Sequence, residues 1–104
     1  GLGFNLNLPL PKGTDYARWS AALDAGCSAI QSFSPDALVV SLGVDTYKDD
    51  PISTFKLEGN DFLRVGERIG ACGVPTLFVM EGGYAVTEIG INVVNVLAGF
   101  ETCA

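Results

Sequence analysis

Two side chains that can do chemistry stand directly after apolar runs of this sequence. Asp45 ends the segment 41–45, which reads SLGVD, and Tyr84 ends the segment 80–84, which reads MEGGY. A carboxylate can bind a metal ion or act as a base, and a phenol can donate a hydrogen bond to a developing oxyanion. If the two runs are neighbouring parallel strands, both groups lie at one edge of a sheet, where open α/β folds place their sites.

Each of these two residues also has a purely structural interpretation. Asp45 precedes Thr46, and a carboxylate at that position can cap the next turn. Its position supports capping and a chemical role about equally. Tyr84 follows Gly82 and Gly83, which allow close backbone approach, and it can simply pack at a strand–helix turn. The chain has no histidine, so no imidazole is present to move a proton near neutral pH. The residues therefore predict part of an active site.

The elements that position these residues follow from the apolar patterns. Residues 5–10 alternate polar and apolar side chains, which predicts a strand. Two continuous apolar runs are typical of parallel strands that are covered on both faces. Apolar positions three or four apart predict three helices, the first with Thr14 as its N-cap. The later strands are expected over 37–42 and 75–80, and the helices over 15–33, 61–71 and 86–98.

This alternation predicts an α/β fold of the order β-α-β-α-β-α, with three layers and a parallel sheet. We expect residues 1–104 to form a single domain, or part of one. Three parallel strands leave hydrogen-bonding edges open, and only 17% of residues are charged, below the average of about 25%. Both features favour a chain that completes its fold with another segment or that forms a homo-oligomer.

Composition excludes several function classes. A net charge of −6, with six scattered basic residues, disfavours nucleic-acid binding. The three cysteines show no CxxC spacing, so free thiols in a reducing cytoplasm are expected. No apolar run of about 20 residues predicts a membrane span, and no leader is recognisable, so we expect a cytoplasmic protein that does not bind membranes. GxGxxG and Walker motifs are absent.

Together, the motifs resemble the zinc-dependent histone deacetylase and acetylpolyamine amidohydrolase family. The resemblance covers nearly the whole chain and implies the C-terminal portion of an arginase/deacetylase-like fold. Glu81 makes the second motif closer to bacterial acetylpolyamine amidohydrolases and class II deacetylases than to class I enzymes, which carry an extra glycine there. The matching segments are 3–10, 41–46 (SLGVDT), 50–51 (DP), 78–86 (FVMEGGYAV) and 89–101.

The resemblance implies a role for each candidate residue. Asp45 is expected to be the second of two aspartates that bind a catalytic zinc ion. Tyr84 is expected to polarise the acetyl carbonyl and to stabilise the tetrahedral intermediate. Ile52 is expected in the wall of the substrate tunnel, and the backbone of Gly82 and Gly83 near its floor. The implied chemistry is metal-assisted hydrolysis of an acetylated amine, with acetylpolyamine ahead of acetyl-lysine.

The chain departs from the family at one point. The family's Asp-x-His zinc motif and tandem histidine pair lie upstream of the matched region, and this chain contains neither. One aspartate cannot hold a catalytic zinc ion, which takes three protein ligands and water. We therefore expect a fragment that binds zinc weakly and is inactive without a complementing N-terminal segment. The alternatives are a non-catalytic module that self-associates through its sheet edges, and an unrelated doubly wound domain that binds a small anion.

Overall fold

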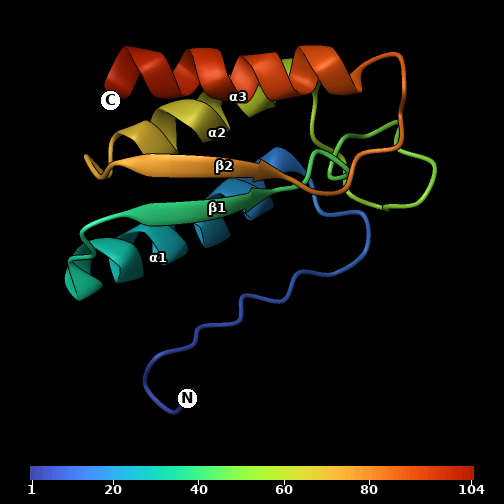
Figure 1. Cartoon of the computed structure of the whole chain (residues 1–104). Coiled ribbons are helices and arrows are strands. Elements are labelled where there is room, and N and C mark those ends of the chain that lie inside the picture. The colour runs from blue at the N-terminus through green and yellow to red at the C-terminus, as the bar shows by residue number, and fades with distance from the viewer.

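The computed structural model describes residues 1–104 and contains three helices and two strands (Figure 1). The α/β class and the parallel sheet predicted from the sequence are confirmed. None of the helices is long and apolar enough to cross a membrane. In chain order the elements are α1 (Tyr16–Phe33), β1 (Leu38–Leu42), α2 (Gly59–Gly70), β2 (Thr76–Met80) and α3 (Ile89–Cys103).

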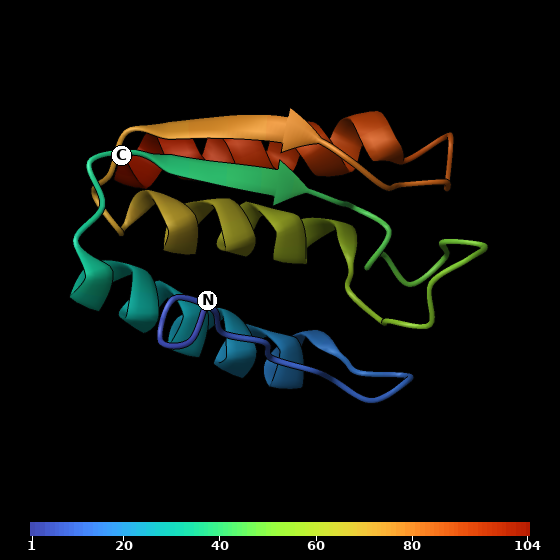
Figure 2. The ribbon, with the colours of Figure 1, turned by 60° about the horizontal axis from the view of Figure 1, so that its bottom comes forward.

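The two strands pair in parallel, with α2 as the crossover between them. The register runs from Leu38 opposite Thr76 to Leu42 opposite Met80. The arrowheads of both strands point the same way in Figure 2, so the segments that follow β1 and β2 leave the sheet at the same edge. This edge carries the segments in which the sequence places Asp45 and Tyr84.

The hydrophobic core lies between the sheet and the helices α2 and α3. Because side chains alternate along a strand, Val40 and Leu42 of β1 turn toward this core together with Phe78 of β2. Phe78 meets Phe100 of α3 edge to face, with ring centroids 5.3 Å apart. The fully enclosed part of the core consists of Leu42, Val44, Leu57, Phe62 and Val96.

The opposite face of the sheet is apolar and uncovered. Val39 is 64% exposed, and its partner in the register, Leu77, is 61% exposed. The sequence predicts strands covered on both faces, but this chain supplies a cover for one face only. A continuous apolar run shows that both faces of a strand suit burial, and it says nothing about which segment provides the cover.

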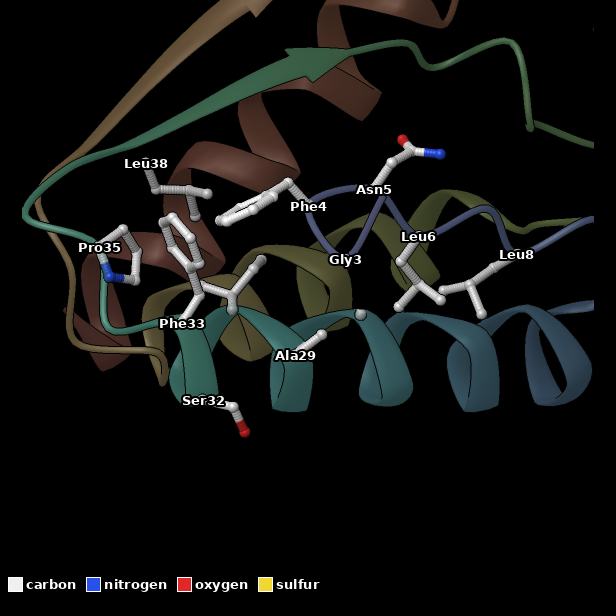
Figure 3. Close-up of a pocket in the computed structure, with 12 residues that line it drawn as sticks. Gly3, Phe4, Asn5, Leu6, Leu8, Ala29, Ser32, Phe33, Pro35 and Leu38 are labelled. Carbon is white, nitrogen blue, oxygen red and sulfur yellow. The ribbon is translucent and has the colours of Figure 1, made fainter. Parts of the chain in front are cut away.

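The strand predicted over residues 5–10 is wrong. The segment is extended, but it pairs with no strand. Figure 3 shows Leu6 and Leu8 over α1, while Asn5 points away from the helix. The polar–apolar alternation is therefore satisfied by packing against a helix. Such alternation reports the side-chain directions of extended backbone, and a strand also needs a neighbour for its N–H and C=O groups.

All three helix starts differ from their predicted positions. Helix α3 begins at Ile89 and ends at Cys103, whereas the sequence predicts 86–98. At α1 and α2, side chains other than the expected ones cap the helix. The Oδ1 atom of Asp15 accepts a hydrogen bond from the backbone N–H of Arg18 (3.1 Å), so Asp15 is the N-cap of α1. The predicted cap, Thr14, is buried and donates to the Pro11 carbonyl instead. Helix α2 begins earlier than predicted, since Asp61 Oδ2 accepts from the Glu58 N–H at 2.7 Å.

The third helix lies unusually close to α2 at two glycines. A Cβ atom added at Gly66 would collide with the Val96 carbonyl oxygen and lie 2.8 Å from the Phe100 nitrogen. A Cβ atom added at Gly99 would collide in the same way with the Leu63 carbonyl oxygen. Only glycine allows this approach. The close packing fixes the position of α3 on α2, and this limits the path of the loop 81–88 that leads to α3.

Candidate functional site

The strand pairing continues past the ends of β1 and β2. The N–H of Glu81 donates to the Leu42 carbonyl at 2.9 Å, and the N–H of Val44 donates to the Gly82 carbonyl at 2.8 Å. The two exit segments therefore run side by side as far as Asp45 and Gly82. The shared sheet edge expected from the two motifs is present.

The carboxylate of Asp45 lies against the backbone of Gly82. A Cβ atom at Gly82 would lie 2.9 Å from the Asp45 Cγ, and one at Gly43 would lie 2.8 Å from its Oδ1. Glycine at both positions leaves room for the carboxylate. Asp45 is half-buried, and its side chain makes no hydrogen bond and no ion pair. No backbone N–H donates to it, so the turn-capping interpretation is not realised.

Tyr84 is held by its backbone, whereas its side chain is free. Tyr84 is 48% exposed, and its hydroxyl has no hydrogen-bond partner in the chain. Its backbone N–H donates to Oδ2 of Asp50 at 2.9 Å. The interpretation that Tyr84 merely packs at a turn therefore does not fit, because about half of the residue is exposed.

Gly83 makes the turn before Tyr84 possible. Its φ is +149°, a value that residues with a side chain rarely adopt. A Cβ atom there would also lie 2.7 Å from Cγ2 of Val44. Glycine at position 83 is therefore required by backbone conformation and by the close approach of the two exit segments.

Ile52 lies on a tight turn at 70% exposure. The turn is closed by Asp50, whose Oδ1 accepts from the backbone N–H of Ile52 at 2.8 Å and of Ser53 at 3.0 Å. The same carboxylate binds the Tyr84 N–H through its other oxygen. One buried side chain thus joins the Ile52 turn to the Tyr84 segment.

Asp50 is the residue that the sequence-based candidates missed. It is only 6% exposed. Burial by itself would raise its pKa, but hydrogen bonds from backbone N–H groups outweigh burial and hold the pKa below the ordinary value. An Asp-Pro pair with Ser at the third position after the aspartate, as in residues 50–53, is a signal for a side-chain-capped turn. No local sequence pattern predicts that Asp50 also binds the backbone N–H of Tyr84. The donors are the N–H groups of Ser53, Ile52, Tyr84 and Ala85.

The loop that carries Asp45 and Asp50 is fastened to the core by Leu57. A bridge pairs Tyr47 with Leu57, and the Leu57 N–H donates to the Thr46 carbonyl at 3.1 Å. Leu57 itself is fully buried. The loop is therefore attached to the hydrophobic core through Leu57, although it contains no helix or strand.

The residues present fit a metal ion at one ligand position only. Asp45 offers a carboxylate without a competing partner, which suits a cation such as zinc. No group of three or more His, Cys, Asp or Glu side chains in the chain is arranged to hold a metal ion. The chain can therefore contribute one ligand to a metal site and cannot complete the site by itself.

An open groove of about 710 Å³ lies elsewhere, between residues 3–8 and the C-terminal half of α1 (Figure 3). Phe4 and Phe33 meet there edge to face, with ring centroids 6.5 Å apart. None of the candidate residues Asp45, Ile52 or Tyr84 lines it. The candidate site is instead the surface at the sheet edge.

Comparison with known proteins gives a consistent result. The model of the histone deacetylase domain matches residues 1–100. The chain is 63% identical over 101 residues to acetylpolyamine amidohydrolase 2 of Pseudomonas aeruginosa, covering 97% of this chain and 29% of that protein. It is 52% identical to the acetylpolyamine amidohydrolase of Mycoplana ramosa, with 95% and 29% covered.

A solved structure is similar over almost the whole chain. The crystal structure of acetylpolyamine aminohydrolase from Burkholderia pseudomallei superimposes with a TM-score of 0.95 at 41% identity. The match covers 99% of this chain and 30% of that one. The chain thus spans less than a third of the length of the relatives that it matches.

Proposed function

This chain belongs to the histone deacetylase domain family, and we propose that it supplies one zinc ligand and the oxyanion-stabilising phenol of an amidohydrolase active site. The proposed reaction releases acetate from an acetylated amine. The observation that carries the proposal is the placement of the Asp45 carboxylate against Gly82, two residues before Tyr84. A metal ligand and a phenol donor thereby share one edge of the sheet.

In the proposed site, each residue of this chain has a separate task. Asp45 binds the metal through its unpartnered carboxylate. Zinc, when bound, supplies polarisation of the carbonyl and activation of water. The Tyr84 hydroxyl donates a hydrogen bond to the carbonyl oxygen as negative charge develops on it. The exposed ring and free hydroxyl of Tyr84 leave this donor available.

The substrate enters between the two segments that follow the strands. Ile52 lies exposed on one of them and offers an apolar wall for a methylene chain. The backbone of Gly82 and Gly83 forms the other segment, where a side chain would collide with Asp45 or Val44 and push the two segments apart. Since relatives that are 52% to 63% identical bear the name acetylpolyamine amidohydrolase, we place acetylpolyamines ahead of acetyl-lysine.

The site needs residues that this chain lacks. With no histidine in the chain, the general base and the other metal ligands must come from another segment. We propose that this is the remainder of the same deacetylase domain, because the relatives are more than three times longer than their match to this chain.

The proposal is tested in the complete domain that contains this chain, by zinc content and acetate release from an acetylated diamine. We expect Asp45→Asn to lose both zinc and activity. Tyr84→Phe should keep zinc and lose activity about 100-fold, the order of effect seen when an oxyanion donor is removed. Asp49→Asn, an equal charge change at an exposed neighbour, is the control. Full activity of Tyr84→Phe would exclude the proposed role of the phenol.

A further inference from the structure

We propose that Asp50 is a positioning residue of this active site, which fixes Tyr84 and the Ile52 turn relative to each other. The inference rests on the proposed function of Tyr84. Asp50 touches neither the metal ligand Asp45 nor the Tyr84 hydroxyl, so any effect on the reaction passes through the segments that it holds.

The contacts of Asp50 have an unusual distribution. Both carboxylate oxygens are used, one for each of two chain segments that are far apart in the sequence. Oδ1 accepts from Ile52 at 2.8 Å and from Ser53 at 3.0 Å, and Oδ2 accepts from Tyr84 at 2.9 Å. No lysine or arginine pairs with Asp50. A buried carboxylate that is satisfied only by backbone N–H groups acts as a clamp between two loops.

Asp50 is unsuited to acid–base work. Burial would favour its neutral form, but the backbone N–H donors outweigh burial and hold its pKa below the ordinary value. The group therefore stays ionised at neutral pH, and its oxygens already accept hydrogen bonds. Its contribution to the reaction is geometric.

Tyr84 needs such a clamp because little else holds it. Its ring is half-exposed and its hydroxyl is unbonded within the chain. Two glycines precede it, one with a φ of +149°, and glycine leaves the backbone more conformational freedom than any other residue. The last backbone hydrogen bond between the paired exit segments is at Gly82. The Asp50 bond to the Tyr84 N–H therefore fixes the backbone from which the phenol extends.

The test is a double-substitution cycle of Asp50→Asn and Tyr84→Phe in the complete, zinc-loaded domain. Asparagine has the same shape and one carbonyl oxygen, so it can serve one of the two segments only. We expect Asp50→Asn alone to lower kcat about tenfold, with a smaller change in KM, since small displacements of a catalytic group cost this much or more. Asp49→Asn should change neither constant.

The cycle separates positioning from a general structural role. If Asp50 acts through the phenol, Asp50→Asn lowers kcat no further once Tyr84 is phenylalanine. A role in overall folding would lower kcat by the same factor in both backgrounds, and that result would overturn the proposal. Asp50→Glu, which keeps both acceptor oxygens, should recover part of the lost kcat.

A second measurement stands apart from activity and from the folding of any variant. In the unsubstituted protein, amide hydrogen exchange at Tyr84 should be at least tenfold slower than at Val86, which is exposed and donates no backbone hydrogen bond. Equal exchange at both amides would overturn the clamp. If the clamp is present but the domain releases no acetate from any acetylated amine, the proposed function fails and the link between Asp50 and Tyr84 stands.

Discussion

The backbone N–H of Tyr84 donates to Oδ2 of Asp50 at 2.9 Å, across 34 positions of the chain. This bond ties the loop after β1 to the loop after β2, beyond the point where the strands themselves stop pairing. It joins a residue proposed for the reaction to one that has no direct part in it.

The Asp50 bonds predict that stability depends on pH in the acid range. A carboxylate whose pKa is lowered by folding stabilises the folded state fully above its ordinary pKa. That stabilisation is lost as the pH falls through the lowered, folded-state pKa. Urea unfolding of the complete domain should therefore show a smaller fall in the free energy of unfolding from about pH 6 to about pH 2 in Asp50→Asn than in the unsubstituted protein. An unchanged pH dependence would contradict this.

The contact between α2 and α3 predicts different effects on stability for two similar substitutions. Gly66→Ala forces a methyl group against the Val96 carbonyl and should lower the free energy of unfolding by about 1–3 kcal/mol. Gly90→Ala, in the first turn of α3, meets no atom within 4 Å. It should be neutral or stabilise by up to about 1 kcal/mol, because alanine favours helix. Chemical denaturation of both variants measures the difference, and equal effects would be inconsistent with the close approach.

The three thiols are expected to react in a fixed order. Burial and a hydrogen bond with Cys72 raise the pKa of Cys27 to about 11, and only the thiolate is nucleophilic. Cys103 is exposed. Alkylation of the folded protein at about pH 8 should modify Cys103 first and Cys27 last. Mass spectrometry of the peptides gives the rates, with protein in guanidinium as the control. Equal rates in the folded state would be evidence against the buried position of Cys27.

The 104-residue chain by itself should not hydrolyse acetylated amines. It presents one free carboxylate and no group of three metal-binding side chains, whereas a catalytic zinc site uses three protein ligands. Incubation with zinc and acetylputrescine should release no acetate above the level of an Asp45→Asn variant. Zinc-dependent release by the isolated chain would refute this expectation.

The uncovered sheet face predicts that the isolated chain associates with itself. Val39 and Leu77 are largely exposed on neighbouring strands, and an open apolar face of a sheet favours association. Light scattering after size-exclusion chromatography should give a mass above that of a monomer. Leu77→Lys should shift the chain toward the monomer, whereas Leu2→Lys, at a fully exposed position outside the sheet, should not. A monomeric unsubstituted chain would rule out this association.

Much of the fold could be predicted from local patterns. The continuous runs of β1 and β2 and the apolar stripes of the helices report burial directly, and the strand–helix alternation implies a parallel sheet. The strand over residues 5–10 could not be excluded, because its alternation is equally consistent with packing on α1. The starts of α1 and α2 also differ from the predicted ones, since neighbouring residues compete to cap the same helix end.

The family could be recognised from the amino-acid sequence, because its motifs combine particular residues at particular spacings. The same motifs made Asp45 and Tyr84 the candidates for metal binding and oxyanion stabilisation. That the Asp45 carboxylate is unpartnered and that Asp50 accepts from the Tyr84 N–H became visible in the folded chain alone. Both facts depend on contacts between loops that are distant in the sequence. Local residue preferences contain no information about which carboxylate a distant backbone N–H will meet.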